Sequence, residues 1–430
     1  MKQQFYKYVF QNVAGMIGIS VYILADTYFI SVHSGADGIT VLNLVLPLFG
    51  LIFAIGSMIG IGSATRYAIK KAQGKENVDF YFTHSLTWQM IFSIPFILVG
   101  IFAPGKFLEI MGGDANIITL GTDYVRIIFL FTPFFMLNYT FTAFARNDNA
   151  PTIAMIACLA GSTFNIVFDY IFMFPMKLGL AGAALATAIS PIVTSLITCK
   201  HYTSKACSIK LQWVVPSFRQ LFLCMQFGVS AFVGEMSSAI TTTIFNVLLL
   251  GIAGNIGVAA YGVVANLSLI AMAIFNGISQ GVQPLLSTAY GQGNQKELKQ
   301  FLGMGLVTNL IVEGIVLLLA WGMTDVLVGI FNSEGNAVLA EYAYDGLRLY
   351  FLGYLLAGVN MMLVTYFSAT DRARNASIAS LLRGAVAVIA CAVIMSMIWG
   401  MNGVWLSFLA AEGITLLVIF AMWKTGRKEV

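Results

Sequence analysis

Some acidic side chains lie inside stretches of the chain that are otherwise almost wholly apolar. A carboxylate at the centre of a bilayer costs roughly 2.5 to 3.5 kcal/mol on insertion scales, so a chain that keeps one there uses it. We expect no Lys or Arg at comparable depth, so the expected partners are protons, metal cations or cationic substrates. The acids in such stretches are Asp26, Asp169, Glu235, Glu313 and Glu412.

Two of these acids have a polar companion one helical turn away. Asn165 precedes Asp169, and Tyr22 precedes Asp26, at the i, i+4 spacing that places each pair on one helix face. If the two helices face each other, the side chains form one pocket, in which two acids cannot both ionise cheaply and titrate as a unit. Such a pocket can take a proton or bind Na⁺ through oxygen ligands. We therefore expect Asp26 and Asp169 to hold a coupling ion.

The other three acids allow a structural interpretation beside the functional one. Glu235 lies in the stretch FGVSAFVGEMSS, where Gly and Ser indicate close packing or an open cavity, and we expect it to bind cations. Glu313 follows Asn309 by one turn, and Glu412 precedes Gly413. A hydrogen bond to a neighbouring helix explains these two as well as function does, so both are secondary candidates.

The elements that carry these residues are predicted to be transmembrane helices. Of the 430 residues, 59% are hydrophobic and 10% are charged, whereas a soluble domain has about a quarter charged residues. Apolar stretches of roughly 20 residues, enough to cross a bilayer, recur throughout, and they do not alternate as barrel strands must. We predict an all-α polytopic membrane protein with twelve crossings, near residues 11–31, 40–68, 82–103, 120–145, 150–174, 178–199, 218–250, 257–289, 298–323, 342–369, 376–398 and 403–423.

The chain looks like a six-helix unit used twice. The stretch RIIFLFTPFFMLN, from Arg126 to Asn138, matches RLYFLGYLLAGVN, from Arg348 to Asn360, and LGLAGAAL matches WGMNGVWL at nearly the same offset. Because six is even, both halves begin on the same side of the membrane, so we predict two lobes related by a pseudo-two-fold axis along the membrane normal. The predicted units are an N-terminal lobe (1–200), a cytoplasmic linker (201–217) and a C-terminal lobe (218–430).

Basic residues give the predicted orientation, because Lys and Arg accumulate on the cytoplasmic side. With the N-terminus inside, all but four of the 23 Lys and Arg residues fall in inner segments. We expect a multi-pass protein of the plasma (inner) membrane with both termini in the cytoplasm and no nucleic-acid partner. The first apolar run is too long for a signal peptide and lacks an A-x-A site, so we interpret it as the first helix. The four outer residues are Lys106, Arg126, Lys177 and Arg348.

Cysteine and histidine residues near the linker raise the question of a metal site. Cys199, His201, Cys207 and Cys224 lie in or beside the linker, but their spacing fits no zinc pattern, and the five cysteines form no CxxC motif. We expect free thiols facing a reducing cytoplasm and no metal bound by them.

Five stretches of the chain carry recognisable motifs. The first helix ends in VYILADTYFI, an aspartate followed by Thr, an aromatic and an aliphatic residue. FARNDNAP is a charged turn with Pro, FNIVFDYIFMF contains Asn-x-x-x-Asp, and LGLAGAALATAIS contains Gly-Ala-Ala-x-Ala-Thr. QGVQPLLSTAYGQGN combines Gln, Pro and Gly-x-Gly. These motifs resemble those of the MATE family of multidrug and toxin extrusion transporters, in its bacterial branch, and the matches extend from the first to the tenth predicted helix.

The resemblance implies a secondary active transporter that exports cationic amphipathic compounds in exchange for H⁺ or Na⁺ by alternating access. It implies a cation site, able to bind Na⁺, made of Asp26, Asn165, Asp169 and Thr187, with Glu235 as the acid of the C-terminal lobe. We expect no cofactor besides the coupling ion. The expected partners are small cationic drugs and the lipid bilayer, and we expect the chain to act as a monomer.

The chain also departs from the family pattern. Many members have Pro in the first half of helix one, whereas the stretch QNVAGMIGIS has none, and Gly15 and Gly18 offer only a weaker hinge. Ser230 stands where the family often has Pro, and no acid lies midway along the tenth helix, so we expect no ion site there. Gln283 of the Gln and Pro pattern, at the end of the eighth helix, is a further secondary candidate.

Three other function classes compete with this interpretation. A flippase for a lipid-linked precursor shares the two-lobe plan, but its cavity needs basic groups for phosphate, which we do not expect here. GIFAPGKF spells most of a phosphate-binding loop but has Phe107 where Ser or Thr should hold Mg²⁺. Because this stretch also falls at an outer membrane edge, we expect neither an ATP-driven pump nor an enzyme. The absence of a TVGYG-like filter in the sequence weighs against a channel.

Overall fold

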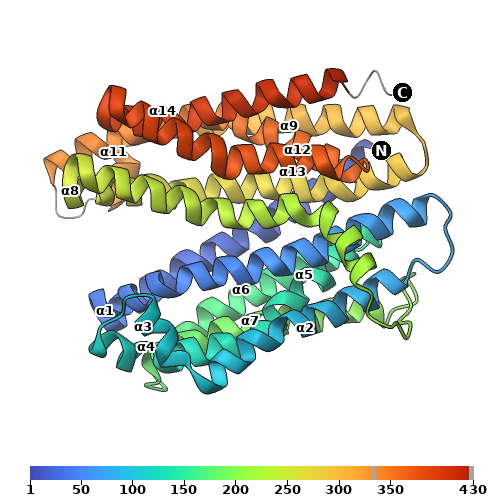
Figure 1. The fold of residues 1–430 in the computed structure, drawn as a ribbon, viewed down its shortest axis with the longest axis horizontal. Coiled ribbons are helices and arrows are strands. Elements are labelled where there is room, and N and C mark those ends of the chain that lie inside the picture. Colours follow the sequence, from blue (N-terminus) through green and yellow to red (C-terminus); the bar gives the residue numbers. More distant parts are fainter. Residues whose placement is uncertain (332–335, 426–430) are drawn as a thin grey trace.

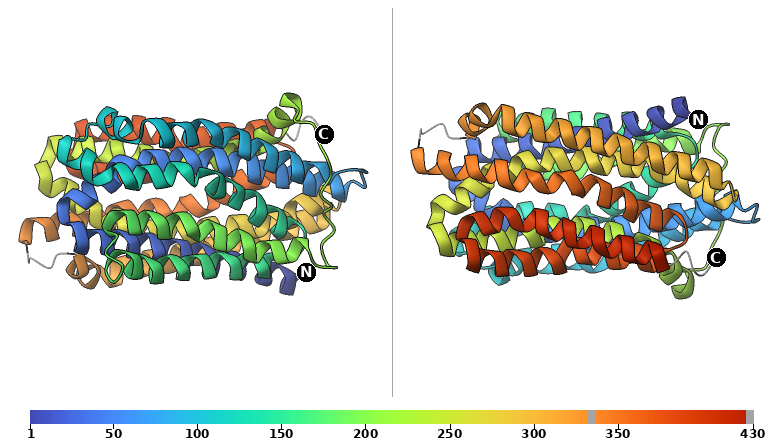
Figure 2. Two further views of the ribbon diagram at one scale, coloured as in Figure 1. Left: turned by 90° about the horizontal axis from the view of Figure 1, so that it is seen from below. Right: turned by 90° about the horizontal axis from the view of Figure 1, so that it is seen from above.

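The computed structural model describes residues 1–331 and 336–425, and the described chain is built of helices. They form two bundles that lie side by side with their long axes in a similar direction (Figures 1 and 2), α1 to α7 mainly in one and α8 to α14 mainly in the other. The elements are α1 (Lys2–Ala72), α2 (Phe80–Phe102), α3 (Pro104–Ile110), α4 (Ala115–Leu130), α5 (Thr132–Asn147), α6 (Pro151–Met173), α7 (Gly179–Tyr202), α8 (Phe218–Gly291), α9 (Gln295–Gly322), α10 (Thr324–Phe331), α11 (Ala337–Tyr350), the 3₁₀ turn η1 (Phe351–Gly353), α12 (Tyr354–Ala369), α13 (Ala373–Leu381), the π-helical turn η2 (Leu382–Val386) and α14 (Ala387–Thr425).

Glycines with positive φ divide the longest helices into separate spans. The breaks are at Gly35 in α1 (φ 55°), Gly254 in α8 (φ 64°) and Gly400 in α14 (φ 57°), a conformation that glycine adopts without steric cost. Nine described stretches are long and apolar enough to cross a membrane. Two of these, α8 and the stretch from α13 through α14, are long enough for two crossings each and are divided at Gly254 and Gly400. The bent pair of α4 and α5, at 43°, adds one more. The predicted twelve crossings are thus confirmed, whereas the short helices α3 and α10 are additional to the prediction.

The same turns recur in both halves of the chain, which confirms the two-lobe architecture. Positive φ values occur at positions separated by nearly the same offset as the matching sequence motifs. An internal repeat places equivalent turns at equivalent ends of the two bundles. The matching residues are Gly35 and Gly254, Gly74 and Gly293, Asn149 and Asp371, and Gly179 and Gly400.

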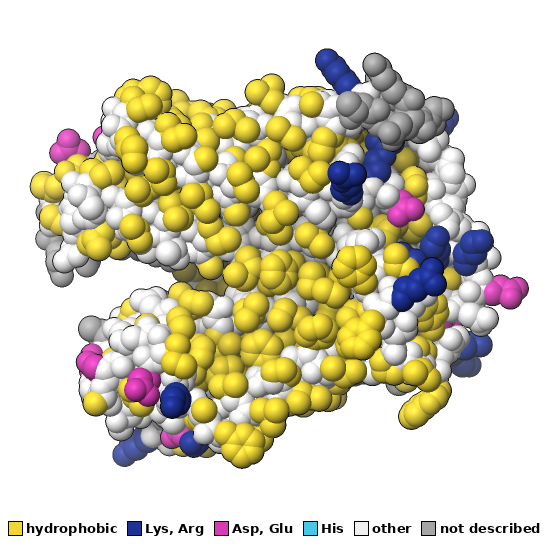
Figure 3. Space-filling model, in the orientation of Figure 1, with side chains coloured by type: hydrophobic (Ala, Val, Ile, Leu, Met, Phe, Trp, Pro, Cys, Tyr) yellow, Lys and Arg dark blue, Asp and Glu magenta, His cyan; other side chains and the backbone are white. Residues whose placement is uncertain are grey.

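The two lobes touch at one end and separate at the other. A Cβ atom on Gly228 of α8 would overlap the carbonyl oxygen of Met58 in α1, and one on Gly62 of α1 would overlap that of Cys224. A wedge-shaped cleft separates the lobes at the opposite end, and most Lys and Arg side chains visible in Figure 3 gather at the closed end. The cleft therefore opens away from the basic side chains.

The close crossing at Gly228 gives a first testable prediction. Gly228→Ala places a methyl group against the backbone of the other lobe, so the helices must shift. We expect the free energy of unfolding to fall by about 1 to 3 kcal/mol, which lowers the melting temperature. Gly251→Ala in the same helix is the matched control, because a Cβ added there meets no described atom within 4 Å beyond the adjoining turns of its own helix. Within a helix, Ala is favoured over Gly by about 0.5 to 1 kcal/mol. Equal melting temperatures for the two variants would contradict a tight crossing.

Candidate functional site

Four of the predicted site residues lie together in the N-terminal lobe. Asp26 comes from α1, Asn165 and Asp169 come from α6, and Thr187 comes from α7, and each is at most 8% exposed. A side-chain hydrogen bond joins Asp26 to Asp169. With the Asn165 amide oriented to satisfy both its ends, Nδ2 donates to Asp169 Oδ2 at 3.1 Å and Oδ1 accepts from the Thr187 hydroxyl at 3.2 Å. The i, i+4 spacing and the resemblance together thus point to residues that are neighbours in space.

Small residues let α6 and α7 approach closely enough to form this cluster. A Cβ on Gly182 of α7 would lie 2.8 Å from the carbonyl carbon of Phe172 in α6. Further along, Ser190 Oγ donates to the carbonyl oxygen of Gly161 at 2.9 Å. Small and hydroxyl-bearing residues are the ones that pack helices tightly within a bilayer, which is why the stretch LGLAGAALATAIS positions Thr187 against α6.

The carboxyl pair has the oxygen atoms and the burial that a site for an exchangeable cation needs. A hydrogen bond between two carboxyl groups needs a proton on one of them, and two adjacent negative charges in a desolvated site are costly. Oδ1 of Asp26 and Oδ1 of Asp169 are buried and have no hydrogen-bond partner among the described residues. With the oxygens of Asn165 and Thr187, the donor set consists of hard oxygens, which suit Na⁺ as well as a proton.

Two tyrosines border the carboxyl pair. Tyr22 interacts electrostatically with Asp26 and Asp169, as its spacing from Asp26 predicts. Tyr124 of α4 interacts with the same two acids, and its buried hydroxyl has no hydrogen-bond partner in the described part of the chain. The sequence does carry a signal for the inward face of α4, because Tyr124 shares the helical spacing of the apolar residues Ile117, Val125 and Ile128, away from Asp123 and Arg126. That spacing does not show which side chains Tyr124 meets.

A cavity of about 340 Å³ lies between the two lobes. Side chains from α1, α5, α6 and α7 form one wall, and side chains from α8, α12, α13 and η2 form the other. Tyr22 lines the cavity, whereas Asp26 and Asp169 do not. Rings mixed with a few amide and hydroxyl groups are typical of a small-molecule site. Among the lining residues are Phe53, Phe135, Asn138, Asn276 and Gln280.

Glu235 and Gln283 also line this cavity, and both bridge the lobes. Tyr139 Oη in α5 donates to Glu235 Oε1 in α8 at 3.2 Å. Gln283 Nε2 donates to Thr65 Oγ1 at 3.0 Å, and its Oε1 accepts from Asn147 Nδ2 at 3.3 Å. Rotation of one lobe against the other has to break or exchange these bonds.

Glu313 and Glu412 are buried in the C-terminal lobe and do not line the cavity. Glu313 Oε1 accepts from the backbone nitrogen of Val359 at 2.9 Å. Glu412 Oε1 forms an ion pair with Arg383 Nη2 at 2.7 Å, and Asn360 Nδ2 donates to its Oε2 at 2.7 Å. Fixed protein donors therefore hold both oxygens of Glu412 and one oxygen of Glu313, whereas Glu313 Oε2 is buried and has no hydrogen-bond partner among the described residues. The structural interpretation thus fits Glu412, and it fits Glu313 only in part.

The expectation that no basic side chain lies deep is wrong. Arg383 in η2 and Arg146 in α5 both line the central cavity. Their burial is substantial, since the Arg383 side chain is 12% exposed and Arg146 is 8% exposed. The sequence pattern places both near helix ends, where long basic side chains usually reach water, but packing turns them inward. Cationic cargo therefore cannot be argued from a lack of basic groups.

The pattern of residues along both lobes matches a known family. The MatE family model matches residues 13–171 and 230–394, which hold Asp26, Asn165, Asp169 and Glu235. The chain belongs to the MatE family.

Relatives of this MatE-family chain extend over almost its whole length. Multidrug export protein MepA of Staphylococcus saprophyticus is 28% identical over 401 residues, 92% of this chain and 88% of the relative. Multidrug export protein MepA of Staphylococcus aureus is 27% identical over 400 residues, with the same coverage. These similarities extend over both lobes.

Solved structures of MatE-like transporters share the fold. A multidrug resistance MATE family transporter of the MOP superfamily in an outward-facing conformation has a TM-score of 0.91 at 23% identity, over 99% of this chain and 95% of that chain. A MOP superfamily transporter from Pyrococcus furiosus, described with a binding pocket of reverse polarity, has a TM-score of 0.90 at 22% identity, over 99% and 95% of the two chains.

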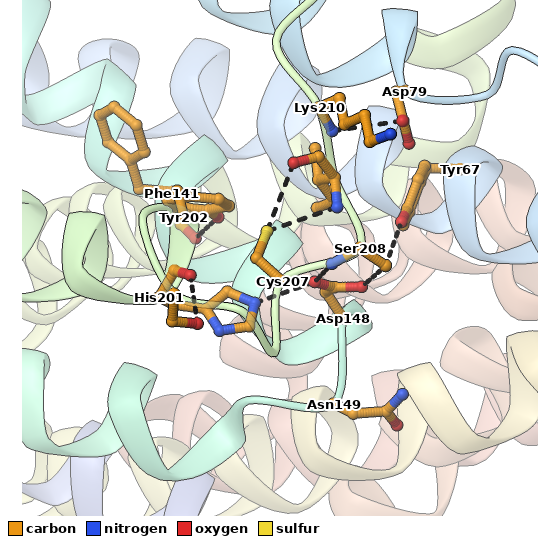
Figure 4. A network of polar contacts seen from close by, with 12 residues as sticks. Tyr67, Asp79, Phe141, Asp148, Asn149, His201, Tyr202, Cys207, Ser208 and Lys210 are labelled. Atoms are coloured by element: carbon orange, nitrogen blue, oxygen red, sulfur yellow. Dashed lines mark hydrogen bonds and ion pairs between the residues drawn. The ribbon is translucent and has the colours of Figure 1, made fainter.

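In this MatE-family protein, Asp148 fastens the segment between α7 and α8 to the N-terminal lobe (Figure 4). Asp148 Oδ1 accepts from Lys71 Nζ at 2.9 Å, and Oδ2 accepts from the Ser208 backbone nitrogen at 2.9 Å. His201 Nε2 lies 2.9 Å from the same Oδ2. The Ser208 hydroxyl bonds to both Asp148 and Lys71. The segment is therefore docked against its own lobe.

The same network raises the metal question again, because ligand atoms of Asp148, His201 and Cys207 lie within 4.8 Å of one another. His201 and Cys207 were considered from the sequence, but Asp148 was not. The protein's own donors, Lys71, His201 and Ser208, already engage the carboxylate oxygens. A metal ion would have to displace the Lys71 ammonium, so we assign this network a structural role.

The Asp148 network predicts a stability that depends on pH. Burial raises the pKa of Asp148, but hydrogen bonds from Lys71 and Ser208 outweigh burial and hold the pKa below its ordinary value of 3.8. Because the folded pKa is the lower one, the stabilisation is full above the ordinary value and is lost as pH falls through the folded pKa. At pH 7 we expect the free energy of unfolding of Asp148→Asn to be about 1.5 to 3 kcal/mol below that of the wild type. Thermal melts over a range of pH should show this difference shrink in strong acid. A difference that does not change with pH would contradict this.

Proposed function

We propose that this protein is a secondary active multidrug exporter that exchanges amphipathic cationic compounds for inward-moving H⁺ or Na⁺ by alternating access. The observation that carries the proposal is the buried Asp26–Asp169 pair, which interacts with Tyr22 of a cavity lined by both lobes. The names of the MepA relatives support multidrug export as the transport reaction.

The proposed orientation follows from the basic end of the molecule. Lys and Arg accumulate in cytoplasmic segments, so we place the closed end of Figure 3 in the cytoplasm and the cleft toward the outside. The chain is then a multi-pass protein of the plasma membrane with cytoplasmic termini. We propose that it acts as a monomer and needs no cofactor besides the coupling ion.

The coupling ion and the cargo compete through the N-terminal lobe. An ion that enters through the open cleft joins the oxygens of Asp26 and Asp169 and cancels the negative charge beside Tyr22. Because the cavity then attracts a cation less, cargo held there is released to the outside. The membrane potential favours this inward ion by about 2.3 kcal/mol per charge per 100 mV.

Rotation of the lobes then exposes the cavity to the cytoplasm. The crossing of Gly62 and Gly228 must open, and the bonds from Tyr139 to Glu235 and from Gln283 to Thr65 must break. The ion leaves toward the cytoplasm, where it is dilute or electrically favoured, and new cargo enters. The ion thus shifts the balance between the two forms by binding one form better than the other.

A flippase for an anionic lipid-linked precursor is the second candidate. Arg146 and Arg383 favour it, because guanidinium groups that line a cavity can hold phosphate. Glu235 in the same wall opposes it, since a phosphate would meet that carboxylate.

Proteoliposomes separate these candidates. An H⁺ gradient and an Na⁺ gradient are imposed in separate experiments. We expect one of them to accelerate ethidium movement in the direction opposite to the ion, and the movement to reverse when that gradient is reversed. Movement of a fluorescent anionic lipid between leaflets without an ion gradient, and no driven movement of ethidium, would favour the flippase. Dye movement that follows only the dye's own gradient would indicate a channel.

A further inference from the structure

Arg383 lies where the regular helix of the C-terminal lobe is interrupted. Residues Leu382–Val386 form a π-helical turn between α13 and α14. Such turns are rare and occur often at functional sites, because they redirect one side chain out of the helical register. Here the turn carries a guanidinium group to the wall of the central cavity.

Glu412 fixes the orientation of this guanidinium group. Arg383 Nε lies 3.1 Å and Nη2 lies 2.7 Å from Glu412 Oε1. The carboxylate is itself held, because Asn360 Nδ2 donates to Glu412 Oε2 at 2.7 Å and to the Glu412 carbonyl oxygen at 2.8 Å. Two of the three guanidinium nitrogens are thus occupied, and no described residue accepts a hydrogen bond from Nη1. Since Arg383 lines the cavity, Nη1 is the nitrogen left for a bound molecule.

An acid lies on the neighbouring helix of the same wall. A Cβ on Gly384, the residue after Arg383, would lie 2.8 Å from Val233 Cγ1 and 3.1 Å from Ser237 Cβ. Val233 and Ser237 form the face of α8 that packs on η2, whereas Glu235, two residues from each, points away from that contact. Glu235 and Arg383 nevertheless both line the cavity, so its wall presents a carboxylate and a pre-oriented guanidinium group at separate positions.

We infer that Arg383 is an anion-accepting subsite, which binds the carboxylate or a similar acceptor of a cargo whose cationic group faces Glu235. This inference rests on the proposed export function and names a substrate class within it, amphipathic zwitterions. Arg146 serves less well, because no carboxylate of the described residues pairs with it and its Nη1 already donates to Asn12 Oδ1 at 3.3 Å. A guanidinium group held by one carboxylate keeps a donor edge in fixed geometry for a second acceptor.

A matched pair of dyes tests the subsite. Rhodamine B carries a cationic ring system and a carboxylate, and its ethyl ester has the same cation without the carboxylate. The test variant combines Arg383→Met with Glu412→Leu, and the apparent affinity for each dye is measured in proteoliposomes. We expect the affinity for rhodamine B divided by the affinity for its ester to be about tenfold lower in this variant than in the wild type, which corresponds to about 1.4 kcal/mol. Both charges are removed together, so that neither is left unpaired in the lobe.

A second variant guards against a folding defect. Arg383→Lys keeps the charge and loses the planar fork, so we expect the ratio to lie between the wild type and the double variant. An unchanged ratio in both variants would overturn the subsite. Wild-type export of the ester but not of rhodamine B would also overturn it and leave the export function standing. Failure of the wild type to export either dye under an ion gradient would overturn the export function and, with it, the subsite.

Discussion

Asp169→Asn is expected to abolish ion-driven efflux, and Asp26→Asn is expected to do the same. Asn has nearly the shape of Asp and can still bond to Asn165, but it cannot accept a proton or neutralise Na⁺. The two carboxyl groups are hydrogen-bonded to each other and are proposed to hold the cation together. Replacing either one leaves a single carboxyl group to bind it. A fall of at least about tenfold in gradient-driven efflux is expected, since about 1.4 kcal/mol of lost ion binding already gives that factor.

The matched control for this prediction is Asp123→Asn. Asp123 is 69% exposed in α4 and pairs with Arg126 at 2.9 Å, and an exposed pair of this kind contributes only about 0 to 1 kcal/mol. We expect normal efflux from this variant in the same proteoliposome assay. Normal gradient-driven efflux from Asp26→Asn and Asp169→Asn as well would refute the proposed ion site.

Glu412→Ala is expected to destabilise the protein more than Gly228→Ala or Asp148→Asn does. The change leaves the Arg383 guanidinium inside the lobe, 12% exposed, without the carboxylate that now lies 2.7 Å away. Breaking a buried pair in this way costs about 3 to 5 kcal/mol, most of it from the charge left without a partner. Denaturant titration in mixed micelles should show this loss in the free energy of unfolding.

The control for the stability prediction is the double variant Arg383→Met combined with Glu412→Leu. Apolar side chains of similar volume often replace a buried pair at little cost or with a gain, so we expect its free energy of unfolding to lie near that of the wild type. If Glu412→Ala were as stable as the double variant, the ion pair would not be the feature that holds η2 against α14.

The N-terminal site was predictable because most of its residues are polar side chains within apolar stretches of the sequence. Asn165 and Asp169 share a helix face by spacing alone, and Tyr22 and Asp26 do so on another helix. Thr187 needed the resemblance, since a single hydroxyl in a helix of small residues has no distinctive spacing. The structure brings Asp26, Asn165, Asp169 and Thr187 together, and their role in ion coupling stays a prediction.

The missed residues are those whose direction depends on packing. Arg383 points inward because of the π-helical turn, and one-turn irregularities leave no mark in a hydropathy pattern. The polar residues Asp123 and Arg126 show that Tyr124 lies on the buried face of α4, but they do not show which helices that face meets. The Asp148 network likewise depends on which neighbouring segments meet. The absence of Pro from the first half of helix one fits the structure, since α1 has no non-helical residue before Gly35.

The most direct test of the account is whether cargo binding expels the coupling ion from the carboxyl pair. Ethidium can be titrated into the purified protein while proton release is followed in weakly buffered solution and Na⁺ release with a sodium electrode. The account predicts release of H⁺ or Na⁺ by the wild type, and none when Asp169 is replaced by Asn. Equal ion release from the wild type and Asp169→Asn would contradict it.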